Sequence, residues 1–121
     1  MRSTRSNDVR QRLQDIVENA EFAREVCADL TMEEFALNRG AFYTATRCLE
    51  IISEATRKLP TELKERHPEV NWRAAAGAGN VYRHDYPTVE PRQIWTTVRT
   101  QVAAMEAAVR AELAALPPAD E

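Results

Sequence analysis

The sequence predicts an all-α fold, an antiparallel four-helix bundle in which residues 1–121 form one domain. Apolar residues recur at steps of three and four along most of the chain, as one face of an amphipathic helix requires. No segment alternates with a period of two over a useful length, so no sheet is expected. A chain of 121 residues is large enough for one hydrophobic core and too small for two.

The first two expected helices are separated by a break at residues 29–31. The apolar stripe of the first helix runs from Val9 to Leu30. Thr31 and Glu34 then have the spacing of a capping box, in which each side chain satisfies a backbone N–H of the other residue. We expect the second helix to run from this cap without interruption to the residue before Pro60.

The second half of the chain predicts two more helices. Residues 60–70 are rich in charge and contain two prolines, which indicates a connection with one helical turn. Asn71 is expected to cap a third helix over residues 72–85. A fourth helix begins at Pro91, which suits a first helical turn, and the prolines at 117–118 end it.

Composition restricts the class of protein. The formal net charge is −3, which argues against a protein that coats nucleic acid without specificity but leaves room for a local basic groove. No stretch approaches the roughly 18 apolar residues of a membrane span, and no signal peptide is seen, so we expect a cytoplasmic protein that binds no membrane. Cys27 and Cys48 are expected to be reduced. No residue spacing suits a metal site, and no cofactor is expected.

The residues that suggest chemistry gather at the end of the third helix. Asn80 and His84 are four apart, so they share a helix face and can address one substrate together. An unperturbed histidine has a pKa near neutral pH, so His84 could transfer protons. Its ordinary alternative is a favourable interaction with the helix dipole. Tyr86 follows at the point where Pro87 should end the helix. Its phenol is therefore expected to be accessible.

The two glycines of the third helix and the other histidine of the chain also need an interpretation. Gly77 and Gly79 each weaken a helix by roughly 1 kcal/mol relative to alanine. Close approach of another helix would explain them, and so would space for a ligand phosphate or base; both can hold. The other histidine, His67, precedes Pro68 and is interpreted as a solvated loop residue.

The chain resembles the HepT-like family of the HEPN superfamily, the toxin halves of toxin–antitoxin pairs whose other half is a minimal nucleotidyltransferase. The likeness spans most of the chain. Its residues are Phe35, the run Leu49-Glu50-Ile51-Ile52-Ser53-Glu54-Ala55 (glycine in the family at Ser53), Pro68-Glu69-Val70-Asn71-Trp72, Asn80, His84, Tyr86, Val89 and Trp95.

This resemblance implies a HEPN-type bundle that pairs into a homodimer and cleaves RNA without a metal. His84 would be the general base or acid and Asn80 would orient the phosphate. Tyr86 would accept AMP from the nucleotidyltransferase antitoxin, which silences the toxin. Glu54 and Asp85 are expected beside the site, where Glu54 would orient His84 or an arginine unless it forms an ordinary salt bridge.

One position departs from the family pattern. The family has arginine directly before the asparagine, and this chain has Gly79 there. Losing such an electrostatic stabiliser costs roughly a hundred- to thousandfold in rate, which predicts a weakened or inactive nuclease. Arg83 lies four residues later, and helical side chains lean back over the preceding turn. We therefore hypothesise that Arg83 takes the missing arginine's place; the alternative is a solvated surface arginine.

Three hypotheses for function follow from these observations. The chain is a ribonuclease toxin, or a non-catalytic dimer that binds the nucleotidyltransferase and accepts AMP on Tyr86, or a structural helical adaptor. Arg73 is about 16 Å from His84 along the helix, too far to share a phosphate. Arg92 and Arg99 could line a substrate path, although solvated surface positions are their ordinary role.

Overall fold

The computed structural model describes residues 4–84 and 90–118, with side chains described at 7–78 and 90–118. Within these ranges it is helical and contains no strand, so the all-α prediction is confirmed. No helix in this part of the chain is long and apolar enough to cross a membrane. The helices are α1 (Thr4–Ala28), α2 (Met32–Leu37), α3 (Arg39–Arg57), α4 (Thr61–Glu65), α5 (Trp72–His84), α6 (Pro91–Arg99) and α7 (Gln101–Ala115).

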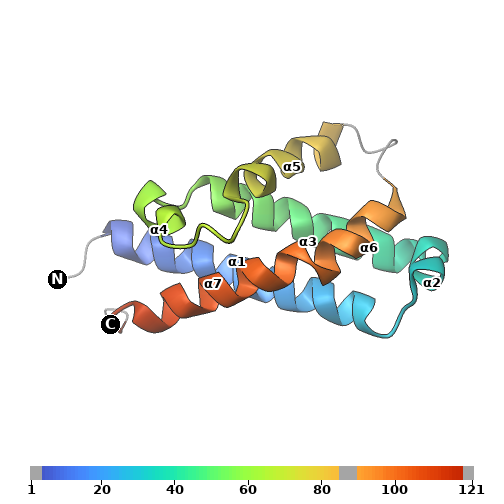
Figure 1. Cartoon of the computed structure of the whole chain (residues 1–121), viewed down its shortest axis with the longest axis horizontal. Coiled ribbons are helices and arrows are strands. Elements are labelled where there is room, and N and C mark those ends of the chain that lie inside the picture. The colour runs from blue at the N-terminus through green and yellow to red at the C-terminus, as the bar shows by residue number, and fades with distance from the viewer. Residues whose placement is uncertain (1–3, 85–89, 119–121) are drawn as a thin grey trace.

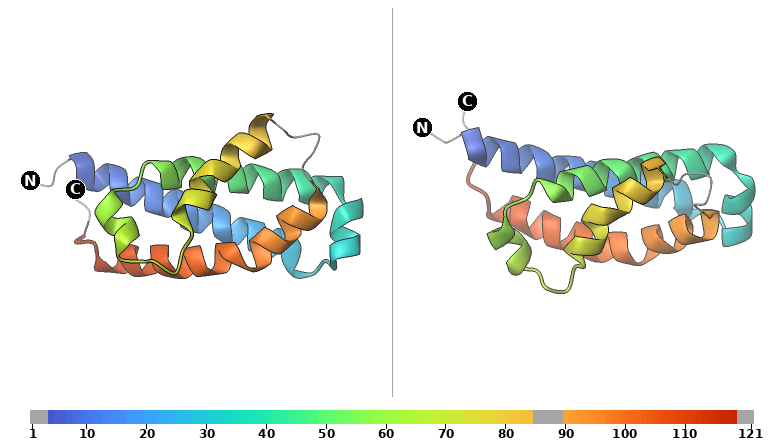
Figure 2. Two further views of the ribbon diagram at one scale, coloured as in Figure 1. Left: turned by 45° about the horizontal axis from the view of Figure 1, so that its top comes forward. Right: turned by 90° about the horizontal axis from the view of Figure 1, so that it is seen from above.

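The long helices form an antiparallel bundle (Figure 1). Helix α3 runs back along α1, and α5 lies over α3 in the opposite direction, while α6 and α7 follow one another as the fourth rod (Figure 2). The start of α1 and the end of α7 lie at the same end of the bundle, opposite α2. The four-helix arrangement expected from the sequence is therefore confirmed.

One continuous core joins these helices, and it follows the predicted apolar stripes. Apolar area removed from water stabilises a fold by roughly 25 cal/mol per Å². The fully buried side chains of largest volume are Phe35, Leu13, Ile16, Ile94, Val98 and Val109. Cys27 and Cys48 are also buried and free, and burial raises the pKa of both thiols.

The expectation of one uninterrupted second helix is wrong. The chain leaves helical geometry at Asn38, with φ −105° and ψ 96°, and this residue both ends α2 and begins α3. Its side chain accepts a hydrogen bond from the N–H of Ala41 at 2.9 Å, and its own N–H donates to the carbonyl of Phe35. A cap of this kind leaves the apolar periodicity intact, which is why the pattern concealed it. Helix α3 also ends at Arg57, two residues earlier than expected.

The fourth expected helix is likewise divided, into α6 and α7. Thr100 has φ −116° and ψ −69°, and its hydroxyl donates to the carbonyl of Thr96 at 2.7 Å. Such a bond to the preceding turn bends helices. Two predicted caps are confirmed: the Thr31 capping box is complete, and the Asn71 side chain accepts from the N–H of Ala74 at 3.0 Å.

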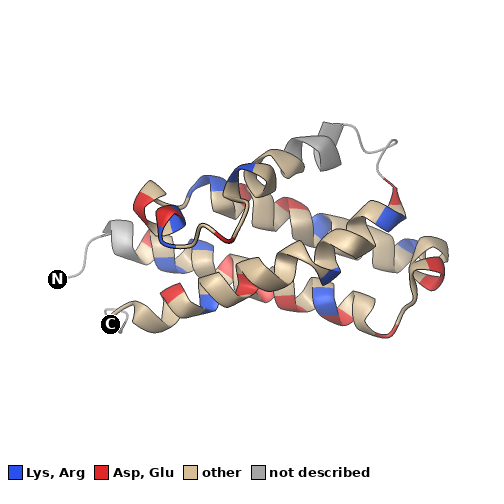
Figure 3. Ribbon diagram, viewed as in Figure 1, with Lys and Arg blue, Asp and Glu red and all other residues tan. Residues whose placement is uncertain are grey.

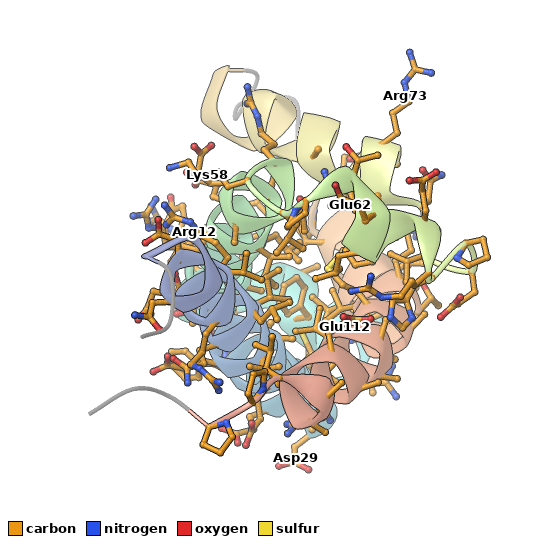
Figure 4. The ribbon with its side chains drawn as sticks, turned by 90° about the vertical axis from the view of Figure 1, so that its left-hand side faces the viewer. Arg12, Asp29, Lys58, Glu62, Arg73 and Glu112 are labelled. Atoms are coloured by element: carbon orange, nitrogen blue, oxygen red, sulfur yellow. The ribbon has the colours of Figure 1, made fainter. Side chains whose placement is uncertain are left out.

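The interpretation of His67 as a solvated loop residue is wrong. Its side chain is only 15% exposed, and Nε2 lies 2.6 Å from an oxygen of Glu112 on α7. Arg66 donates two hydrogen bonds to the same carboxylate, at 2.6 and 3.0 Å. Trp72 donates from its indole to the His67 carbonyl at 3.0 Å. Figure 4 shows Glu112 directed from α7 toward this segment, so the contact fixes where α5 begins.

Glu112 should therefore make bundle stability depend on pH. Hydrogen bonds from Arg66, aided by His67 and opposed by burial, lower the pKa of Glu112. A carboxyl with a lowered folded-state pKa stabilises the fold above its unfolded value of about 4.3, and this contribution is lost as pH falls through the lower folded value. We predict that Glu112→Gln lowers the free energy of unfolding by about 1.5 kcal/mol at pH 7.

Urea unfolding measured between pH 7 and pH 3 checks this prediction. The difference between wild type and Glu112→Gln should shrink as the wild-type carboxyl becomes protonated. Glu65→Gln is the matched control, since Glu65 is exposed on the neighbouring α4 and the substitution should change stability by less than about 0.5 kcal/mol. A difference that stays constant across this pH range would show that the Glu112 ion pairs do not stabilise the bundle.

Candidate active site

The candidate site lies on α5, and one hydrogen bond fixes how α5 crosses α3. The hydroxyl of Ser53, which is 2% exposed, donates to the carbonyl of Ala76 at 2.9 Å. His84 lies eight residues beyond Ala76, or about 12 Å along the helix. Since α5 runs opposite to α3, its last turn is positioned above the middle of α3 (Figures 1 and 2).

Beneath α5 the packing is incomplete. A cavity of about 70 Å³ lies between α3, α5, α6 and α7. The α5 side contributes only alanines, and Thr97 and Gln101 place polar groups opposite them. The lining residues on α3 and α5 are Leu49, Ile52, Ser53, Ala74, Ala75 and Ala78. This helix is therefore held mainly by its contact with α3.

Helix α5 carries the principal candidate residues on neighbouring turns. Asn80, Arg83 and His84 lie within the last two turns of α5, so Asn80 and His84 are one turn apart on the same face. The side chains of these three residues are outside the part that the structure describes. Asp85 and Tyr86 lie outside the described residues altogether. The roles assigned to these residues from the sequence stay predictions.

The acidic candidate on α3 is Glu54, which lies one residue beyond Ser53. Its side chain is 46% exposed, and its carboxylate lies 3.6 Å from the ammonium group of Lys58, the residue that follows α3, in an i,i+4 pair. A surface salt bridge, the ordinary alternative, is therefore present. Orientation of His84 by Glu54 stays a prediction.

The other arginines considered for a substrate path lie in different settings. Arg73 is exposed on the first turn of α5 and extends away from the bundle (Figure 4). Arg92 is exposed near the start of α6. The guanidinium of Arg99 lies 4.6 Å from the centre of the Trp95 ring and 3.5 Å from the carbonyl of Cys27. Arg99 therefore contacts the end of α1, which gives it a structural role.

Gly77 is exposed, and a Cβ atom added there would meet nothing within 4 Å in the described structure. Packing of another helix of the same chain therefore does not explain this glycine. The helix presents a bare surface beside the candidate residues, which agrees with space for a ligand or for a second molecule.

Sequence comparison identifies the family. The family model described as "Ribonuclease HepT-like" matches residues 16–112. The chain belongs to the ribonuclease HepT-like family. It is 32% identical over 94 residues to "Probable ribonuclease HepT" of Thermococcus cleftensis, a match that covers 78% of this chain and 86% of that protein.

Other relatives match a similar share of the chain. A protein of Methanocaldococcus jannaschii named as a candidate RNase is 34% identical over 95 residues, which cover 78% of this chain and 87% of the relative. Another candidate RNase, from Caldanaerobacter subterraneus, is 33% identical over 98 residues, covering 81% and 88%. No solved structure matches the chain significantly.

Sequence reasoning noted Ser53 only as a departure from the HepT-like pattern and missed what it does. A serine hydroxyl in a helix can bond its own preceding turn or a neighbouring backbone, and the sequence does not decide between them. Here the Ser53 hydroxyl donates to a carbonyl of α5, and so it sets where the candidate residues of α5 lie relative to α3.

The open surface at Gly77 gives a prediction about stability. Gly77→Ala should raise the free energy of unfolding by about 0.5–1 kcal/mol, because alanine favours helix and the new methyl group meets no neighbour. Urea unfolding of wild type and variant measures the change. Gly40→Ala on α3 is the matched control, since its methyl group would also meet no atom closer than 3.6 Å. A destabilised Gly77→Ala protein would show that another surface packs against this glycine.

Proposed function

We propose that this chain is a HepT-type toxin, a metal-independent endoribonuclease that acts as a homodimer in the cytoplasm. The observation that carries the proposal is the placement of Asn80 and His84 one turn apart at the end of α5, within the segment that matches the HepT-like family. The bare α5 surface at Gly77 supports the approach of RNA or of a second copy.

The proposed reaction is an internal transfer at an RNA phosphate. His84 removes the proton from a ribose 2′-hydroxyl, whose oxygen then bonds to the neighbouring phosphorus. The bond from phosphorus to the 5′ oxygen breaks, and that oxygen takes up a proton. The products are a 2′,3′-cyclic phosphate and a free 5′-hydroxyl. Asn80 holds the phosphate in line during the step.

Negative charge builds on the phosphoryl oxygens in this reaction, and the family arginine that would balance it is replaced by Gly79. We assign this task to Arg83, which lies one turn further along the same helix. The charge and reach of its guanidinium support the assignment, since an arginine can bind two phosphate oxygens at once.

We predict that Arg83→Ala lowers RNA cleavage by roughly a hundred- to thousandfold, the loss typical of a removed oxyanion donor. Arg83→Lys should retain part of the rate, because it keeps the charge and loses the two-pronged geometry. Cleavage of a fluorogenic RNA by purified protein measures both. Arg73→Ala, which removes an exposed arginine from the other end of α5, is the control. Wild-type rates in both Arg83 variants would exclude the assignment.

We propose that the toxin is inhibited by transfer of AMP to Tyr86. A minimal nucleotidyltransferase would bind the dimer and transfer AMP from ATP to the phenol oxygen of Tyr86, releasing pyrophosphate. The added phosphate places negative charge two residues from His84 in sequence. This charge would repel an RNA phosphate from the site.

A second function is favoured by the glycine at position 79. Without the family arginine, the chain could be a catalytically weakened or inactive HEPN dimer that serves as binding partner and AMP acceptor of the nucleotidyltransferase. This alternative keeps the role of Tyr86 and removes that of His84, which makes the two functions separable by experiment.

We predict that expression of the wild type alone arrests growth and that His84→Ala abolishes the arrest. Co-expression with a cognate minimal nucleotidyltransferase should restore growth to cells that make the wild type. Intact mass spectrometry of the protein from those cells should show one or more AMP additions, and Tyr86→Phe should show none. Growth and mass are read from the same cultures.

The outcomes distinguish the two functions. Arrest that depends on His84 supports the ribonuclease. AMP addition without arrest supports the inactive dimer. Arrest that persists in a folded His84→Ala protein would exclude His84 from the chemistry. A Tyr86→Phe protein that still gains AMP would place the acceptor elsewhere. Arg73→Ala, which changes an exposed residue on the first turn of α5, is the control and should leave the growth arrest unchanged.

A further inference from the structure

The outer face of α3 carries an arginine, a tyrosine and another arginine at successive helical turns. Arg39, Tyr43 and Arg47 are four residues apart, so they form one ridge along the helix, about 12 Å from end to end. The Tyr43 side chain is 46% exposed and Arg47 is 69% exposed, while Arg39 is also exposed. We call these three residues the α3 strip.

Contacts within α3 and with α2 hold the tyrosine ring in place. The ring centre of Tyr43 lies 5.8 Å from that of Phe42, which in turn lies 6.3 Å from the fully buried Phe35. Arg39 donates to the Tyr43 hydroxyl at 3.2 Å, and its guanidinium lies 5.7 Å from the centre of the ring. A cation and an exposed aromatic ring are therefore presented together.

In the described residues, the two arginines of the strip form only one ion pair with a carboxylate. Among the described residues, no carboxylate pairs with Arg39. Arg47 lies 3.4 Å from Glu50, in an exposed pair that contributes little and that a phosphate can displace. Basic and acidic positions both occur along α3 (Figure 3), with Glu50 and Glu54 following the strip toward the end of the helix.

We infer that the α3 strip binds an unpaired RNA strand, with Arg39 and Arg47 on phosphates and Tyr43 against a base. The inference rests on the proposed ribonuclease function, because it supplies a path for the substrate to the end of α5. Helix α5 runs antiparallel to α3 beyond the Ser53–Ala76 hydrogen bond, so its end lies on the side of that contact where α3 carries the strip.

The chemistry of the strip selects a single strand over a duplex. An aromatic face can stack only on a base that has left its own stack, as bases do in single-stranded RNA. Stacked nucleotides advance by about 3.4 Å, so 12 Å spans about three of them. Tyrosine and arginine are also common at protein interfaces, so contact with a second copy of the chain is made one outcome of the test below.

The test measures binding with cleavage disabled. The full-length His84→Ala protein is titrated with a fluorescent, unstructured RNA oligonucleotide at several salt concentrations. Adding Tyr43→Ala should weaken binding by about 5- to 100-fold, whereas Tyr43→Phe, which keeps the ring, should bind nearly as His84→Ala does. Adding Arg39→Ala and Arg47→Ala should reduce the slope of log affinity against log salt by about 1.4, or 0.7 for each lost phosphate contact.

A charge-matched control removes two basic side chains from the opposite end of the bundle, by Lys64→Ala and Arg73→Ala. It should keep the salt slope within about 0.3 of the parent protein. Equal RNA affinity and slope in the strip variants would overturn the inference, as would a duplex of the same sequence binding equally well. Variants that lose dimer mass in light scattering while keeping RNA affinity would assign the strip to the contact between copies, and this too overturns it.

These results separate the inference from the proposed function. RNA binding that depends on the strip, in a protein whose wild type neither cleaves RNA nor arrests growth, supports the strip and rejects the ribonuclease. Cleavage that depends on His84 but is indifferent to all strip substitutions supports the ribonuclease and rejects the strip.

Discussion

The seam between α1 and α3 is the contact on which the rest of the bundle depends. The buried residues of these two helices include small side chains beside the larger Leu13, Ile16, Leu49 and Ile52, and small side chains allow helices to approach closely. Because α3 is fixed against α1 on one side, its other side offers a stable surface to α5, and the Ser53 hydroxyl sets the position of α5 on that surface. The small buried residues of α1 and α3 include Ala20, Ala23, Cys27, Ala41, Ala45 and Cys48.

The candidate site and the core are built from different parts of the fold. The largest apolar side chains that are fully buried belong to α1, α2, α6 and α7, and in the described residues α5 contributes none of them. The described part of α5 adds Trp72 to the core and lines the cavity with alanines. The position of α5 is therefore set chiefly by its contact with α3.

Periodicity predicted the bundle because buried apolar area dominates its stability, but it could not show where a helix is interrupted. At Asn38 and Thr100 a polar side chain bonds the backbone locally, and the apolar residues on either side keep their spacing. His67 was misjudged because Glu112 lies 45 residues further along the chain. At the site, spacing predicted a shared face for Asn80 and His84, which α5 confirms; what their side chains do depends on geometry that spacing does not contain.

The chain's negative net charge does not oppose a role in binding RNA, because much of its charge is already paired within the bundle. Burial would raise the pKa of Glu106, but hydrogen bonds from Arg24 and Arg110 outweigh it and lower that pKa. These arginines are thereby committed to a carboxylate on α7, whereas in the described residues Arg39 of α3 pairs with no carboxylate and Arg47 only with the neighbouring Glu50. At physiological salt, charges more than about 8 Å apart on the surface are largely screened. A polyanion therefore responds to the local α3 surface rather than to the total charge of the protein.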